Sequence, residues 1–363
     1  MAKRTNSAVW MENQNRWQVN VQKDGVRRSF TSSTPGRTGQ REANAKADAW
    51  LDGNIEGGST KVSVLYLQYI DYIKATGTIS NWRPAESKGR AWIIPAIGNK
   101  KIQNVTEHDL QAILDNAHAL GKSRKTIMNI RGTLVNFFKH CKRKRFPIPD
   151  ITDLKIPEGA RYKGKNVVQP NGLKILFSVD ETIYRGKRQF EPLIYAFRFQ
   201  VLSGLRPGEL RGLRWDDISD GYVHLSRAVN SYNETTRGKN ENAVRSFRLT
   251  PQMQIVLDQQ RGISESVKPS NYIFDTTGTG NYLKRWQKYC LANDIPPTTV
   301  YELRHTFVSI AKNLPEGQLK SLVGHSANMD TYGIYSHFIA GESEKTAANL
   351  ADIFAEILGQ EQI

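Results

Sequence analysis

The chain has 363 residues, of which 39% are hydrophobic and 24% charged, and its formal net charge is +16. That hydrophobic fraction supplies buried cores for two or three domains and excludes wholesale disorder. The excess of lysine and arginine makes a polyanion, above all nucleic acid, the first partner to consider, with an anionic membrane surface as the alternative.

Membrane and secretory features are missing from the sequence. No apolar run approaches the ~20 residues of a membrane-spanning helix, and the first residues, MAKRTNSAVWMENQ, lack the apolar stretch of a signal peptide. Cys141 and Cys290 lie far apart with no CxxC spacing. They are therefore expected to be reduced thiols, with neither a zinc site nor a disulfide.

Residues 8–52 predict a small sheet backed by one helix. RWQVNVQ alternates apolar and polar residues, a turn follows, and VRRSFTS completes a hairpin. GQREANAKADAWL then has the apolar spacing of a helix, and residues 53–59 have the composition of a linker. The free sheet face carries Gln18, Asn20 and Arg27, which are candidates to enter a DNA major groove. A solvated sheet face is the alternative for each of them.

Residues 61–155 predict an all-helical domain. VSVLYLQYIDYIKA opens it, and Thr106 is the expected N-cap of the next helix, with acidic residues in the first turn. SRKTIMNIRGTLVNFFKHC then repeats its apolar residues at gaps of three and four, as in a helix that faces a core. That helix ends in a basic run containing Lys142 and Arg143. These side chains either contact DNA phosphates or simply favour the C-terminal end of the helix dipole.

Residues 151–165 are expected to form an exposed basic connector, and helices dominate again from Val167. A strand-rich insert is expected at about 222–250, and a last helix at about 342–359. One face of that helix is apolar, so it must be buried. It packs either on its own domain or on a neighbouring subunit.

Five residues in the last two hundred positions carry the case for function. Arg206 lies in LSGLRPGELRGLRWDDI, Lys239 between two extended segments, Arg304 in VYELRHTFVSIAK, His325 in SLVGHSANMD and Tyr335 in DTYGIYSHF. Taken singly, each has an ordinary structural explanation: a loop arginine, a solvated lysine, a helix-capping histidine or a packed tyrosine. Their order and spacing are what indicate a function.

The pattern Arg…Lys…RH…GH…Y-x-H resembles the catalytic signature of the tyrosine recombinases, the lambda-integrase family. The resemblance spans residues 167–345, and its specific parts are GLRPGEL, LRHTF, VGHS and a tyrosine two positions before His337. The upstream segments are similar to the arm-binding and core-binding domains of conjugative-transposon integrases, with far less specific motifs.

The fold implied by this resemblance is mainly α with small β-sheets, in several domains. The expected divisions are an arm-type DNA-binding domain at 1–58, with a three-stranded sheet and one helix, a helical core-binding domain at 61–155, a mixed α/β catalytic domain at 166–345 and a tail helix at 346–363.

The resemblance also implies roles for the five residues. Arg206 and Arg304 match the two arginines that hold the scissile phosphate, Lys239 matches the hairpin lysine, and His325 matches a second phosphate-contacting position. Tyr335 matches the nucleophile. Two planar, permanently charged guanidinium groups suit the charge that gathers on phosphate oxygens during attack. Lysine, still protonated at neutral pH, can supply the leaving oxygen with its proton.

One position departs from the family pattern. The family usually has histidine three residues before the second arginine, where this chain has Tyr301. A phenol can donate a hydrogen bond to a phosphate oxygen, but it is a poor base at neutral pH because its ordinary pKa is near 10. We therefore include Tyr301 among the catalytic residues as a donor.

A member of this family would be a site-specific recombinase that integrates and excises a mobile element through a 3′-phosphotyrosyl intermediate, without a metal or other cofactor. Its partners would be the DNA of element ends and target sites, three further copies in a tetramer on DNA, and an excision accessory protein. A membrane is not among them. The expected location is the bacterial cytoplasm, at the nucleoid.

Three alternatives remain at this point. A phage integrase of the same family differs only in the element served. A non-catalytic architectural protein fits the basic charge but leaves the ordered Arg–Lys–Arg–His–Tyr set unexplained. A metal-dependent nuclease or transposase would need a cluster of acidic residues that the motif region lacks. Chromosome-dimer resolvases of the family generally lack an arm-binding domain, so residues 8–52 argue against that role.

Overall fold

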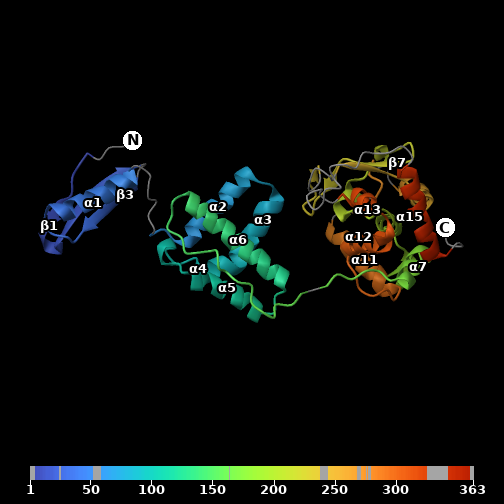
Figure 1. The fold of residues 1–363 in the computed structure, drawn as a ribbon, viewed down its shortest axis with the longest axis horizontal. Helices are drawn as coiled ribbons and strands as arrows, with labels where there is room; N and C mark the ends of the chain where they lie inside the picture. The colour runs from blue at the N-terminus through green and yellow to red at the C-terminus, as the bar shows by residue number, and fades with distance from the viewer. Residues whose placement is uncertain are drawn as a thin grey trace. The chain divides into compact units, whose positions relative to one another are not determined.

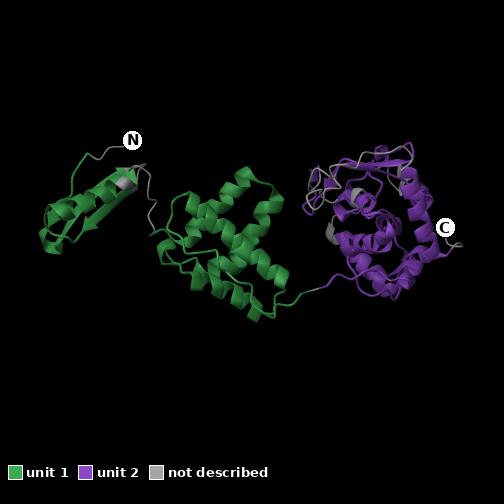
Figure 2. Cartoon of the chain, in the orientation of Figure 1, with its two compact units in different colours: residues 1–163 green, residues 164–363 purple. Residues whose placement is uncertain are grey.

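The computed structural model describes residues 5–23, 26–51, 59–162, 164–237, 244–267, 271–274, 276, 279–324 and 342–359. The chain divides into two compact units, residues 1–163 and 164–363 (Figure 2). Helices dominate both units, and the sheets are small (Figure 1). The expected fold class, mainly α with small β-sheets, is confirmed. No helix in the described part of the chain is long and apolar enough to cross a bilayer.

The first unit begins with an antiparallel sheet and one helix. The strands run in the order β1-β2-β3, and the elements are β1 (Val9–Met11), a 3-10 turn η1 (Glu12–Gln14), β2 (Arg16–Lys23), β3 (Val26–Ser32) and α1 (Gly36–Leu51). The predicted alternation holds, because Val19 and Val21 are buried against Ala43 and Ala47 of α1. The sheet thus has one face packed on α1 and one face left polar.

The strand register decides which residues share that outer face. Asn20 pairs with Ser29, and Gln22 pairs with Arg27. Gln18, Asn20 and Arg27 therefore lie on the same side of the sheet, opposite the side that packs on α1. Gln18 and Asn20 are linked by a 3.3 Å hydrogen bond between their side chains.

The rest of the first unit is helical, as expected. Its elements are α2 (Val62–Thr76), α3 (Ile79–Lys88), a π-helical turn η2 (Gly89–Ile93), α4 (Ile94–Ile97), η3 (Ile102–Asn104), α5 (Glu107–Ala119) and α6 (Arg124–Arg143). Thr106 caps α5 in a capping box with Asp109, which confirms the predicted start of that helix. The whole predicted stripe of α6 is buried: Ile127, Ile130, Leu134, Phe137 and Cys141.

The segment expected as an exposed connector is not exposed throughout. Leu154 and Ala160 are buried in the hydrophobic cluster of the first unit. The Arg131 side chain also donates to the Leu154 carbonyl at 2.7 Å, and the Arg124 N–H donates to the Arg161 carbonyl at 3.0 Å. The expectation of an exposed segment rested on its basic composition and overlooked the apolar side chains that pack on the helices.

The second unit is built around α8 (Ile194–Ser203), all ten residues of which are buried. The other helices are α7 (Pro170–Ser178), α9 (Pro207–Gly212), η4 (Trp215–Asp217), α10 (Pro251–Val267), α11 (Thr279–Ala292), α12 (Val300–Ile310), η6 (Ala311–Asn313), α13 (Glu316–Val323) and α15 (Glu342–Leu358). The strands are β4 (Glu181–Tyr184), β5 (Lys187–Phe190), β6 (Ile218–Ser219), β7 (Tyr222–Leu225), β8 (Ala228–Val229), β9 (Thr235–Thr236) and β10 (Arg245–Arg248).

These strands form a three-stranded antiparallel sheet, in the order β10-β7-β6, and the hairpins β4-β5 and β8-β9. The strand-rich insert was expected from the sequence, but the β4-β5 hairpin was not. α8 contacts α10 and α12, so the segments on both sides of the insert close around one core.

The last helix, expected at about 342–359, is confirmed. α15 begins at Glu342 and packs against α7 and β10 of its own unit (Figure 1). Leu350, Phe354 and Leu358 belong to the same hydrophobic cluster as α8 and α12. In this structure the apolar stripe is therefore buried within the subunit, because its own core offers the matching surface.

Because the apolar stripe of α15 is buried, shortening one of its side chains is expected to reduce stability strongly. Phe354 is 1% exposed, and Phe354→Ala is expected to destabilise the second unit by about 3–5 kcal/mol through the lost burial and the cavity left behind. Urea unfolding of the full chain measures this loss, with Glu356→Ala on the exposed side of α15 as the matched control. A change below about 1 kcal/mol for Phe354→Ala would mean that the helix is not held by this core.

Candidate active site

Arg206 is positioned by a tight turn between α8 and α9. Gly204 ends α8 with a φ of +65°, and a Cβ on it would lie 2.3 Å from the Phe307 ring. Glycine is required here both by the left-handed backbone and by this close approach. Two residues later, Arg206 is the N-cap of α9, and Pro207 starts that helix.

A buried carboxylate holds Arg206 in place. Glu209, which is 2% exposed, accepts the backbone N–H of Arg206 at 2.9 Å and its Nη1 at 2.7 Å. The second terminal nitrogen, Nη2, donates to the Gly324 carbonyl at 3.1 Å. The guanidinium plane is therefore oriented by two elements that are far apart in the sequence.

Arg304 lies in the second turn of α12, which begins at Val300 after a Thr299–Glu302 capping box and not at Arg304 itself. The side chain is 2% exposed and donates to the Gly204 carbonyl at 2.8 Å and to the Val323 carbonyl at 2.6 Å. Burial, together with the neighbouring Arg206, lowers the pKa of Arg304 to about 10. The group therefore remains a cation at neutral pH.

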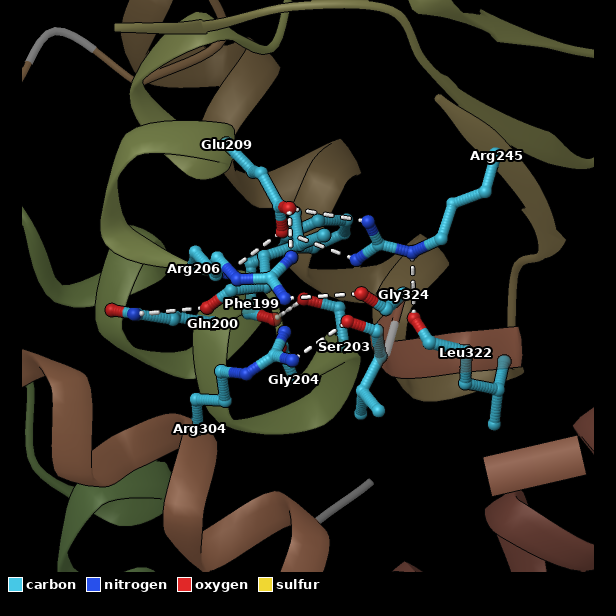
Figure 3. A network of polar contacts seen from close by, with 12 residues as sticks. Phe199, Gln200, Ser203, Gly204, Arg206, Glu209, Arg245, Arg304, Leu322 and Gly324 are labelled. Carbon is cyan, nitrogen blue, oxygen red and sulfur yellow. Dashed lines mark hydrogen bonds and ion pairs between the residues drawn. The ribbon is translucent and has the colours of Figure 1, made fainter. Parts of the chain in front are cut away.

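The end of α13 connects the two arginines with a third one. The carbonyls of Leu322, Val323 and Gly324 accept hydrogen bonds from Arg245, Arg304 and Arg206 respectively (Figure 3). The last carbonyls of a helix have no partner within the helix and form the negative end of its dipole. Three guanidinium groups therefore meet at one helix end.

The structure thus brings Arg206 and Arg304 together, with Tyr301 one turn before Arg304 on α12. Lys239, His325 and Tyr335 lie outside the described residues. Among the described residues, no group of three or more His, Cys, Asp or Glu side chains is placed to hold a metal ion.

Sequence reasoning missed Glu209 and Arg245. The spacing of Glu209, three residues after the N-cap, is the signal that was available, because an acid at that position is typical of a capping box. Arg245 lies in AVRSFRL, where one basic residue among several on an extended segment carries no distinguishing signal. Only the fold shows that this arginine points at Glu209.

Tyr301 is 42% exposed, and its ring packs edge-on against His305, with the ring centroids 5.2 Å apart. Its hydroxyl group is therefore available as a donor, although it is not held as firmly as the two arginines. We expect Tyr301→Phe to slow strand cleavage by a modest factor, about 2- to 10-fold, because one neutral hydrogen bond is lost. Tyr301→His should be tolerated.

Single-turnover cleavage of a nicked duplex measures both Tyr301 variants. A complete loss of cleavage in Tyr301→Phe would contradict this prediction, since it would reveal an essential proton transfer by the phenol.

Comparison with known proteins agrees with this geometry. Residues 173–340 match the model of the phage integrase family. A "Tyrosine recombinase XerC-like" protein of Caldanaerobacter subterraneus subsp. tengcongensis is 22% identical, over 98% of this chain and 100% of its own length. The ICEBs1 integrase of Bacillus subtilis is 23% identical, over 69% of this chain and 72% of its own.

Solved structures share the fold. The Tn1549 transposon integrase bound to circular intermediate DNA superposes with a TM-score of 0.63 at 18% identity, covering 79% of this chain and 99% of that one. A lambda integrase tetramer bound to a Holliday junction gives a TM-score of 0.58 at 16% identity, covering 91% of this chain and 98% of that one.

The second unit, with its paired arginines at one helix end, thus has the fold of the Tn1549 and lambda integrases. Residues 173–340 are a phage integrase domain, and the chain is a tyrosine site-specific recombinase.

Proposed function

We propose that this recombinase is the integrase of a mobile element of the conjugative-transposon type, and that it integrates and excises the element by cutting and rejoining DNA. The observation that carries the proposal is the pair Arg206 and Arg304, fixed on adjacent carbonyls of α13. The similarity to the ICEBs1 and Tn1549 integrases supports the kind of element. A phage integrase is the runner-up, since lambda integrase shares the fold.

In the proposed reaction, Arg206 and Arg304 bind the non-bridging oxygens of the scissile phosphate. The phenol of Tyr335 gives its proton to water as its oxygen attacks phosphorus, a 3′-phosphotyrosyl bond forms, and the bond to the 5′-oxygen breaks. Lys239 protonates that oxygen, and His325 donates a hydrogen bond to the phosphate. Attack by a 5′-hydroxyl group on the phosphotyrosyl bond reverses the steps, so rejoining consumes no ATP.

Trapping the covalent intermediate tests this function. A duplex nicked near the cleavage position loses a short fragment after attack, so the recombinase remains attached to the DNA and the adduct migrates slowly in a denaturing gel. We expect the adduct to form with the element's own end sequences, and to form equally in excess EDTA. An architectural DNA-binding protein would give no adduct, and a metal-dependent nuclease would be inactive in EDTA.

The N-terminal sheet is proposed to bind a second class of DNA site. Gln18 and Asn20 present amides, and Arg27 a guanidinium, on the outer sheet face. Amides and guanidinium groups are the side-chain groups that read adenine and guanine in the major groove. Trp17, Val19 and Val21 belong to the opposite, inner face of the sheet.

A chain starting at Lys61 is therefore expected to cleave core sites but to lose binding to distal sites. Residues 62–160 have a hydrophobic cluster separate from that of the sheet, so removing residues 1–60 should leave the rest folded. Footprinting on element ends measures the loss. Identical footprints of the full and shortened chains would contradict the two-site proposal.

The helical part of the first unit is proposed to contact phosphates near the cleavage site. Lys142 and Arg143 lie in the last turn of α6, and the Arg143 guanidinium lies 6.0 Å from the centre of the Tyr72 ring. We further propose that four copies assemble on DNA, as lambda integrase does on a Holliday junction, together with an excision accessory protein. The site of action would be the bacterial nucleoid.

A further inference from the structure

Arg245 is the third arginine of the cluster. It lies at the start of β10, opposite Leu225 of β7, and its side chain is 8% exposed. Both terminal nitrogens meet Glu209, with Nη1–Oε1 and Nη2–Oε2 distances of 3.1 Å, and Nε donates to the Leu322 carbonyl at 2.8 Å. This is the two-pronged geometry in which arginine holds a carboxylate most firmly.

The contacts of Glu209 show what Arg245 contributes electrostatically. One carboxylate lies between two guanidinium groups, and its Oε1 is shared by Arg206 and Arg245 (Figure 3). If an uncharged residue replaced Arg245, Arg206 would be the only charged donor to Glu209 among these residues. The negative charge of Glu209 would then cancel the positive charge of Arg206. With Arg245 present, three arginines and one carboxylate leave two positive charges for a phosphate.

Arg245 also connects three elements around the clamp. Its own strand is β10, Glu209 lies on α9, and Leu322 lies on the last turn of α13, beside the carbonyls that bind Arg304 and Arg206. Movement of β10 would therefore displace the carboxylate that orients Arg206. A buried network of this kind is rigid only while every member is satisfied.

We propose that Arg245 is a positioning residue of the phosphate clamp, acting through Glu209 on Arg206. It does not touch the phosphate itself. This inference rests on the proposed function, because it assigns Arg245 to the same reaction. Arg245 should then set the rate of cleavage and leave the affinity for DNA nearly unchanged.

Single-turnover cleavage at saturating DNA tests the proposal. Arg245→Gln is expected to slow cleavage by about 10- to 100-fold, less than loss of a direct donor, while the Kd for DNA changes by less than about 3-fold. Arg245→Lys restores the charge without the fork and should recover part of the rate. Arg248→Gln, on the same strand but paired with Glu344 at the surface, is the matched control and should stay within about 3-fold of the wild type.

A double-mutant comparison separates positioning from a general loss of structure. If Arg245 acts through Arg206, then Arg245→Gln should have little further effect, under about 3-fold, in a chain that already carries Arg206→Lys. Equal slowing in both backgrounds would overturn the proposal, and so would unchanged cleavage by Arg245→Gln or equal slowing by Arg248→Gln.

An unfolded variant and an inactive wild type would have different consequences for the proposal. If circular dichroism shows that Arg245→Gln is unfolded, Arg245→Lys takes its place in the same comparison, with an expected slowing of about 3- to 10-fold in the wild-type background only. If the wild type itself forms no covalent adduct, the proposed function fails, and the assignment of Arg245 fails with it. If the wild type cleaves DNA but the effects of Arg245→Gln and Arg206→Lys on the cleavage rate are additive, the assignment of Arg245 is wrong and the proposed function stands.

Discussion

Tyr335→Phe is expected to abolish covalent strand cleavage while DNA binding is retained. Only the phenolic oxygen is removed, and no other atom in the proposed reaction can form the bond to phosphorus. With an ordinary pKa near 10, about one phenol in a thousand is ionised at pH 7, so the nucleophile depends on neighbouring cations for activation. Adduct formation on a nicked duplex and DNA affinity, measured on the same preparation, report the two properties separately.

Tyr332→Phe is the control for this experiment. Tyr332 lies three positions before Tyr335 in DTYGIYSHF and is the other tyrosine of that segment. We expect Tyr332→Phe to form the adduct. If Tyr332→Phe prevents the adduct and Tyr335→Phe does not, the assignment of the nucleophile is wrong.

Arg206→Lys is expected to reduce cleavage by about 10²- to 10³-fold with little change in affinity. Arg206 bonds Glu209 through Nη1 and the Gly324 carbonyl through Nη2. The planar guanidinium group can donate to Glu209 and to the Gly324 carbonyl and still offer N–H groups to a phosphate. The lysine ammonium is a compact point charge and cannot reproduce that geometry.

Single-turnover rates on saturating DNA measure the effect of Arg206→Lys. Arg261→Lys on α10, where the guanidinium lies 4.7 Å from the centre of the Trp215 ring, is the control for a general loss of arginine. Cleavage by Arg206→Lys within about 3-fold of the wild type would remove Arg206 from the site.

The features that were predicted well from the sequence depend on residues that are close together along the chain. The stripe of α6, the capping of α5 by Thr106 and the alternation of β2 depend on helical or strand periodicity and on one hydrogen-bonded turn. The family was predicted from the order of GLRPGEL, LRHTF, VGHS and the final tyrosine motif, and the comparisons confirm it.

Other features depend on contacts between distant segments. The connector at 151–165 was expected to be exposed because it is basic, yet Leu154 and Ala160 are buried. Burial of these apolar side chains is favourable, and the charged side chains of the same segment can remain in water. The stripe of α15 was recognised as apolar, but only the fold shows that it is buried against its own core. A hydrophobic pattern states that a face must be covered and does not state by what.

The candidate site divides in the same way. The sequence by itself predicted which residues are the phosphate ligands, including Arg206 and Arg304, and their order along the chain. Only the tertiary structure decided that Glu209 lies between Arg206 and Arg245, and that the last carbonyls of α13 orient all three arginines. Arg245 lies 36 residues from Glu209, and Gly324 lies 118 residues from Arg206 along the chain. A buried ion needs partners wherever the fold brings them, and their separation along the chain leaves no periodic trace in the sequence.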